Sequence, residues 1–136
     1  MSETPAGTVP IDGIVSTRSP LPMRDTVERL SLLIGAAGAT LFGVIDQSCE
    51  AEQAGLTLRD TKLLIFGNPA AGTPVMAAAP LSALDLPLKI LVWQDDDATV
   101  WMTHLDPAWL AARYGLAREL AAPLGAPAAL TARVGD

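Results

Sequence analysis

The segment 68–73 carries the residue types best suited to binding a small ligand. It contains the turn-forming residues Asn68 and Gly72 and ends at Thr73, which precedes a proline. Threonine followed by proline is typical of a helix N-terminus, where free backbone N–H groups and the helix dipole favour a carboxylate or phosphate. The same residues also suit a tight connection in which Thr73 only caps the helix. The segment lacks the Gly-Lys-Ser/Thr of a P-loop.

Three further side chains are candidates for acid–base chemistry. Asp46 ends a predicted strand, Asp85 precedes a Leu-Pro pair, and His104 is the single histidine. Two carboxyl groups that meet in space can act as acid and base, and histidine titrates near neutral pH. The structural alternatives are a turn at Asp85 and a surface histidine at a strand end. No catalytic residue is assigned, and the candidate ligand-binding residues are Asn68, Gly72, Thr73, Asp46 and Asp85.

The composition excludes several classes of function. Nine basic and fifteen acidic side chains among 136 residues give a net charge of −6, so no basic surface is expected to bind nucleic acid. The single cysteine, Cys49, excludes an intramolecular disulfide and a multi-thiolate metal site. One histidine excludes His-rich metal centres. We therefore expect no metal and no cofactor.

The domain organisation follows from charge and apolar runs. Residues 1–10 contain neither a basic residue nor an apolar run, which predicts a flexible leader and no secretory signal. The uncharged run 30–45 is shorter than the roughly 20 residues of a membrane span and contains three glycines. We expect a cytoplasmic protein with one α+β domain over 11–122 and, because of its prolines and alanines, a loose tail over 123–136.

The elements that must position these side chains follow from hydrophobic periodicity and from residues that start or stop helices. Asp106 followed by Pro107 predicts a helix start, and Gly115 predicts its end. The resulting order predicts an α+β fold with a mostly antiparallel sheet of about five strands. Strands are predicted over 11–17, 40–47, 62–67, 88–94 and 99–104, the last two as a hairpin, and helices over 23–37, 75–79 and 108–114.

The predicted helix 23–37 has an unusual outer side. Leu32, Gly35 and Ala36 lie where the first half of the helix carries charged residues. Either another part of the chain or a second copy covers this side. The predicted strand 62–67 is apolar on both faces between Leu63 and Phe66, which favours a central strand or a subunit contact. Because two-fold dimers are the commonest assembly, we predict a homodimer.

Several short motifs are similar to those of one bacterial family. The sequence resembles the domain of unknown function 302 (DUF 302) over most of the chain, from about Ile11 to Leu116. The resemblance implies a β-α-β(4)-α fold with the helices on one face of the sheet, like one TATA-binding-protein repeat, and dimers. The family has no established reaction, so no catalytic residue is carried over. The matching motifs lie at 62–69, 72–76, 79–80, 85–89, 92–93 and 106–107.

Three positions depart from the pattern of that family. Gln47 stands where a histidine is expected after Asp46, and alanines stand at 70 and 71 where a lysine is common. His104 and Leu105 replace a Tyr-Asn pair. Chemistry that depends on the missing side chains is therefore not carried over to this chain.

Two functional hypotheses remain open from the sequence. The first is a dimeric small-ligand-binding or interaction module without catalysis, whose ligand is small and anionic or polar. The alternative is an enzyme, such as a hydrolase, that uses Asp46, Asp85 or His104. Convergence of these three side chains in one pocket would favour the enzyme, and their separation would favour the binding module.

Overall fold

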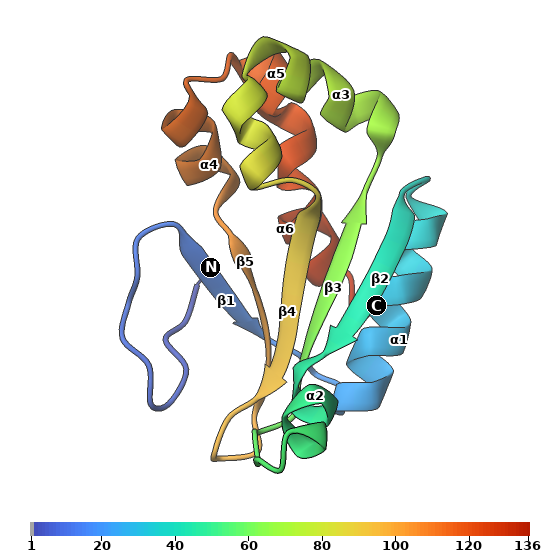
Figure 1. The fold of residues 1–136 in the computed structure, drawn as a ribbon, viewed down its shortest axis with the longest axis vertical. Helices are drawn as coiled ribbons and strands as arrows, with labels where there is room; N and C mark the ends of the chain where they lie inside the picture. Colours follow the sequence, from blue (N-terminus) through green and yellow to red (C-terminus); the bar gives the residue numbers. More distant parts are fainter. Residues whose placement is uncertain (1) are drawn as a thin grey trace.

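Five antiparallel strands form a single sheet in the computed structural model, which describes residues 2–136. The spatial order is β1-β5-β4-β3-β2, so β1 and β2 form the two edges (Figure 1). The predicted α+β fold with about five antiparallel strands is confirmed, and so is the hairpin of the last two strands. The strands are β1 (Ile14–Arg18), β2 (Thr40–Asp46), β3 (Thr61–Gly67), β4 (Leu88–Gln94) and β5 (Val100–Leu105).

The long helix and the C-terminal helix, α1 and α6, pack behind the sheet in Figure 1, whereas the remaining helices cluster at its two ends. Asp106 caps α4 through a bond from the Ala108 N–H at 3.0 Å, and Gly115 ends the helix with a positive φ, as predicted. The helices are α1 (Met23–Ala36), α2 (Gln47–Gln53), α3 (Pro69–Ala78), α4 (Pro107–Tyr114), α5 (Arg118–Ala121) and α6 (Ala126–Thr131), with 3₁₀ turns η1 (Pro80–Leu84) and η2 (Ala122–Gly125).

The hydrophobic core lies between the sheet and this helical layer. Strand side chains alternate between the two faces, so that Leu64 and Ile90, which pair across β3 and β4, both point into the core. Leu30 and Ile34, four residues apart on α1, lie against the same cluster. Both helix residues are completely buried, and this packing against the sheet stabilises α1.

The N-terminal residues partly cover the opposite face, on which no helix of the described chain packs. Residues 2–11 return along β1, where the Glu3 N–H donates to the Ser16 carbonyl at 2.8 Å. The Glu3 carboxylate also pairs with Arg18 at 3.1 Å. Met1 of the predicted leader lies outside the described residues, and the flexibility of the leader stays a prediction.

The predicted tight connection over 68–73 is wrong, because α3 already begins at Pro69. Asn68, and not Thr73, caps this helix through a bond from the Ala70 N–H to its side-chain oxygen at 3.0 Å. Thr73 and Gly72 therefore lie inside the helix. Pro74 is tolerated within it at the cost of one backbone hydrogen bond.

The predicted loose tail over 123–136 is also wrong. Leu124, Leu130 and Val134 are all at most 5% exposed, and the last two belong to the core cluster. Pro123 and Pro127 do not disrupt this segment, since each lies in the first turn of a short helix, where its missing N–H has no intrahelical partner to lose.

Candidate functional site

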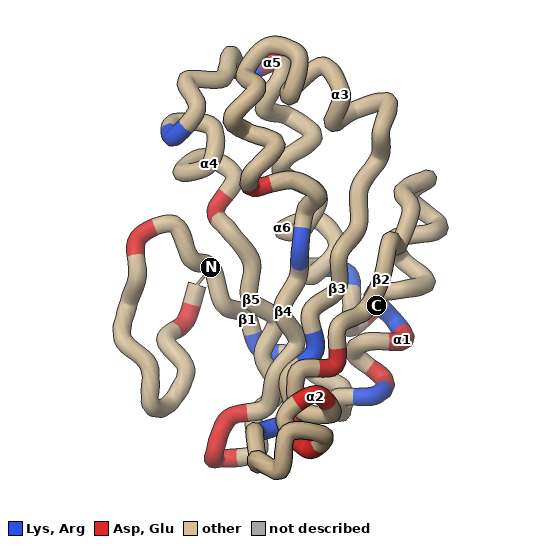
Figure 2. The backbone as a smooth tube through the Cα atoms, viewed as in Figure 1, with Lys and Arg blue, Asp and Glu red and all other residues tan. Residues whose placement is uncertain are grey.

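A cavity of about 450 Å³, which we call the α3–α6 crevice, lies among α3, α6, the C-terminal end of α1 and the adjoining ends of β3 and β4. Most of its wall is apolar, and α3 contributes no charged residue, as Figure 2 shows. Its volume falls in the usual range for small-molecule sites. Among the apolar lining residues are Phe42, Phe66, Val75, Leu88, Leu124 and Leu130.

Three of the five candidate ligand-binding residues line this crevice. Asn68, Gly72 and Thr73 contribute to the wall from the first half of α3, whereas Asp46 and Asp85 lie outside it. The segment predicted to bind a ligand therefore borders the crevice, although it is part of a helix and not a turn.

The backbone donors expected to hold an anion already have acceptors. The N–H groups of Ala71 and Gly72 donate to the Asn68 carbonyl at 2.9 and 2.8 Å, and the Ala70 N–H donates to the Asn68 side chain. The prediction of free N–H groups at this helix start is wrong for these three amides. An anion in the crevice would need another positive partner.

Arg133 supplies a positive charge that was not among the candidate residues predicted from the sequence. It is the only ionisable residue among those that line the crevice, and its side chain forms no ion pair with the described chain. The segment was predicted to be loose because of its prolines and alanines. The available signal was the spacing of Pro127, Leu130 and Val134, which recur at intervals of three and four like the buried side of a helix.

Asp46 has a structural role at the opposite end of the sheet. Its carboxylate caps α2 by accepting bonds from the Ser48 hydroxyl at 2.7 Å and the Cys49 N–H at 3.0 Å. These bonds, aided by Lys62 at 3.8 Å, lower the pKa of Asp46 below its ordinary value. A carboxylate held in its charged form in this way suits a helix cap more than a general acid.

Asp85 joins the segment before β4 to the end of α4. The Tyr114 hydroxyl donates to its carboxylate, and the Arg113 Nε lies 3.3 Å from the same oxygen. The hydrogen bond to Tyr114, with a smaller contribution from Asp85, raises the pKa of Arg113. The Arg113 guanidinium also stacks 5.4 Å from the centre of the Trp109 ring. This cluster fixes the segment that leads to Leu86, which lines the crevice.

His104 is buried, so the prediction of a surface histidine is wrong. It is 5% exposed because it lies on the helix-covered face of β5. Its Nδ1 lies 2.9 Å from the Leu105 carbonyl, which can only accept, so Nδ1 carries the proton and Nε2 is left without a partner in the described residues. Burial lowers the pKa of His104 below its ordinary value, which keeps the ring neutral.

The three acid–base candidates do not form one site. Asp46 pairs with Lys62 at the start of β3, whereas Asp85 precedes β4, whose Leu88 pairs with Phe66 near the end of β3. The two aspartates therefore lie at opposite ends of the sheet. No hydrogen bond joins His104 to either of them within residues 2–136.

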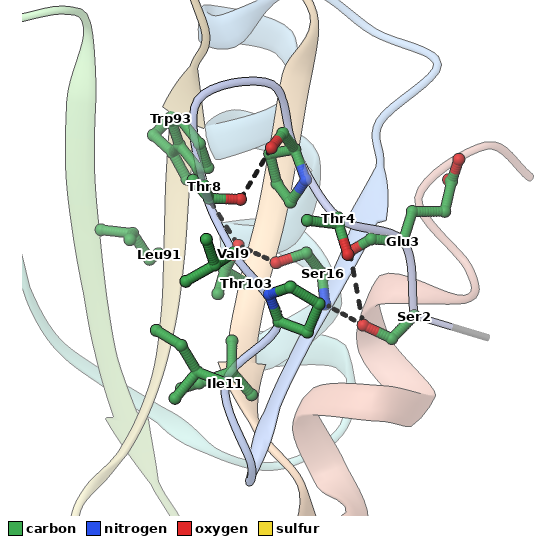
Figure 3. A pocket seen from close by; sticks show the side chains of 13 residues that line it. Ser2, Glu3, Thr4, Thr8, Val9, Ile11, Ser16, Leu91, Trp93 and Thr103 are labelled. Atoms are coloured by element: carbon green, nitrogen blue, oxygen red, sulfur yellow. Dashed lines mark hydrogen bonds between the residues drawn. The ribbon is translucent and has the colours of Figure 1, made fainter.

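A second cavity, of about 530 Å³, lies between residues 2–11 and the helix-free face of the sheet (Figure 3). Several hydroxyl groups line it, and those of Ser2, Thr8, Ser16 and Thr103 already have hydrogen-bond partners. The Trp93 Nε1 donates to the Thr103 hydroxyl at 3.0 Å, which in turn lies 2.8 Å from the Ser16 hydroxyl. We call this space the leader cavity.

Comparison with known families is decisive for classification. The family model described as domain of unknown function DUF302 matches residues 15–129. The chain belongs to the DUF302 family. A solved DUF302 protein of Bacillus stearothermophilus has the same fold, with a TM-score of 0.80 and 21% identity over 90% of this chain and 98% of that one.

Curated relatives of this DUF302 chain are longer proteins. It is 38% identical over 112 residues to the fluoride-specific ion channel FluC 1 of Brucella suis, an alignment that covers 82% of this chain and 44% of the relative. The fluoride-specific ion channel FluC 2 of Brucella melitensis is equally similar, with 42% of its length covered. The chain thus spans less than half the length of these relatives. No helix in residues 2–136 is both long and apolar enough to cross a membrane.

The departures from the DUF302 pattern gain a structural meaning in the crevice. Ala70 and Ala71, where the resemblance to the family led us to expect a lysine, lie in the first turn of α3, and Ala71 lines the crevice. This member has no cation there. Arg133 brings a positive charge to the same cavity from the C-terminal segment.

Proposed function

We propose that this DUF302 domain is a small-ligand-binding module without catalysis of its own and that its ligand occupies the α3–α6 crevice. The observation that carries this proposal is the cavity itself, about 450 Å³ in volume, with a largely apolar wall and a few polar side chains. Sites for small molecules have this composition, because apolar surface supplies affinity and a few polar groups supply orientation.

The separation of Asp46, Asp85 and His104 supports binding over hydrolysis. Two of these side chains serve as a helix cap and a loop anchor, and the third is a buried neutral imidazole. The same three residues would have to meet around a substrate to act as acid and base.

Plugging the crevice tests the proposed site. A Cβ at Gly72 would meet nothing within 4 Å, so the Gly72→Phe side chain can enter the crevice without a backbone clash. Wild-type protein should enhance the fluorescence of 1-anilinonaphthalene, and Gly72→Phe should weaken dye binding at least tenfold. Ala77→Phe, on the same helix but outside the crevice, is the matched control. Equal dye binding by Gly72→Phe and wild type would contradict the proposal.

We further propose that the domain is a homodimer. Leu32 on α1 is 63% exposed, so no other part of the described chain covers it. β2 is an edge strand, and its Phe42, Val44 and Ile45 are also exposed. Such an edge, without a charge before Asp46, is suited to pairing with another chain.

Light scattering at micromolar concentration should give about twice the chain mass of 14.1 kDa. Leu32→Glu should weaken the dimer at least tenfold if the outer side of α1 is the contact, because an unpaired charge would be buried. Arg118→Glu, at an exposed position on α5, is the control. A monomeric wild type would refute the dimer, and a tight Leu32→Glu dimer would move the contact to β2.

A second candidate function rests on the curated relatives. Because proteins named as fluoride-specific ion channels contain a segment 38% identical to this domain, we propose that ligand binding here serves fluoride handling. Removal of this chain from its native host should then increase sensitivity to fluoride, and the wild-type chain should restore tolerance. Unchanged growth over a fluoride series would refute this second function without affecting the proposed ligand site.

A further inference from the structure

The positive charge of the α3–α6 crevice comes from Arg133 alone. Arg18, Arg59, Lys62 and Arg113 form ion pairs with acidic side chains of the described chain. Arg133 forms no ion pair within residues 2–136, and no other arginine or lysine of this range lines either cavity. In a protein with net charge −6, a cation that lines a cavity favours the binding of an anion at that cavity.

The number of available donors limits the kind of anion. The first-turn amides of α3 are occupied by Asn68, and no lysine lines the crevice. A phosphate or dicarboxylate carries more charge than one guanidinium can pair. A single carboxylate matches the forked geometry of one arginine.

The rest of the wall determines the body of the ligand. Phe42, Phe66, Met76 and Leu130 present apolar surface over a volume of about 450 Å³. A charged or hydroxyl-rich body would lose its hydration against these side chains without gaining partners. An unbranched or aromatic apolar body fits this surface and gains affinity with each buried methylene.

We propose that the α3–α6 crevice binds an apolar monocarboxylate, such as a medium-chain fatty acid, with its carboxylate at Arg133 and its chain among the apolar side chains. This inference rests on the proposed ligand-binding function and names its ligand class. Asn68 and Thr73 line the same cavity, and their side chains have a free amide donor and hydroxyl group for a substituent on the ligand.

Calorimetric titration with decanoate and decanol, both below their aggregation concentrations, tests this assignment. Wild-type protein should bind decanoate about fivefold more tightly than decanol, as expected for an ion pair at an exposed arginine, and added salt should reduce the difference. Octanoate should bind about fifteenfold more weakly than decanoate, at about fourfold per methylene.

Arg133→Gln should lower the affinity for decanoate about fivefold and leave that for decanol within twofold, while Arg133→Lys should retain most of the preference. Arg118→Gln, at an exposed arginine that lines neither cavity, is the matched control and should bind like wild type. Equal binding of decanoate and decanol, or an unchanged preference in Arg133→Gln, would overturn the carboxylate assignment alone. Absence of binding by both compounds would overturn the assignment, and with a negative dye experiment it would overturn the proposed function too.

Discussion

The two ends of the chain each form the wall of a cavity, but they are held in different ways. The N-terminal residues 2–11 border the leader cavity, and their apolar side chains Val9 and Ile11 are 72% and 62% exposed. In the C-terminal segment, Leu124 and Leu130 border the crevice and are 3% and 5% exposed. The C-terminal wall is therefore part of the core, whereas the N-terminal wall, residues 2–11, lies on the surface with its large apolar side chains exposed.

The two cavities differ in whether the polar groups that line them already have partners. In the leader cavity, the hydroxyls of Ser16 and Thr103 bond to one another, and the Trp93 Nε1 donates to Thr103. In the crevice, Arg133 forms no ion pair with any side chain of residues 2–136. Unused hydrogen-bonding capacity, and not volume, distinguishes a cavity that can select a ligand.

The largest expected effect is a difference in the free energy of unfolding between substitutions in the C-terminal and the N-terminal wall. Leu130→Ala should lower the free energy of unfolding by about 2–5 kcal/mol, because it removes buried methyl groups and leaves a cavity in the core. Ile11→Ala, in the exposed N-terminal segment, should change the free energy of unfolding by about 0.5 kcal/mol or less. Urea denaturation measures both values. A Leu130→Ala protein as stable as Ile11→Ala would show that the C-terminal segment does not belong to the core in solution.

A second, smaller effect concerns β5, where Thr103 faces the leader cavity and the neighbouring His104 faces the helix-covered side of the sheet. The folded state keeps His104 neutral with a lowered pKa, so the unfolded chain binds a proton first as the pH falls. The free energy of unfolding should be constant above about pH 7 and should decrease as the pH falls through the ordinary histidine pKa of 6.5.

Because His104 is the only histidine, the window from about pH 7 to pH 5 isolates its contribution. Denaturant titrations at several pH values should therefore show a slope for wild type and a flatter profile for His104→Gln. Equal slopes for the two proteins would contradict the buried neutral histidine.

The smallest expected effect concerns the hydroxyl network of the leader cavity. Thr103→Val removes the acceptor of the Trp93 Nε1 bond and should lower the free energy of unfolding by about 1 kcal/mol. Thr73→Val in the crevice is the matched control, because no hydrogen bond of the Thr73 hydroxyl is found in the described chain, and it should change stability by less than about 0.5 kcal/mol. A larger loss of stability in Thr73→Val than in Thr103→Val would indicate that the hydrogen-bonded hydroxyl lies in the crevice and not in the leader cavity.

Local sequence patterns determined most of the secondary structure. Alternation over 88–94 and 99–104 predicted the hairpin within one residue at each end, and Asp106 with Pro107 predicted the start of α4. These signals suffice because the residues that make each hydrogen bond or cap are close together in the chain. The resemblance to DUF302 motifs likewise anticipated the α+β fold with a mostly antiparallel sheet.

Only the tertiary structure decided which of two nearby capping residues starts α3 and which residues, distant in the chain, line the same crevice. Both Asn68 and Thr73 are good capping residues, but packing of Val75 into the protein interior accompanies the earlier helix start at Asn68. Arg133 lines the same crevice as the segment that contains Asn68 because α6 packs on the sheet, which brings together positions far apart in the chain. Sequence spacing carries no signal for such an encounter, so the sequence identified one wall of the crevice and the fold supplied the charge.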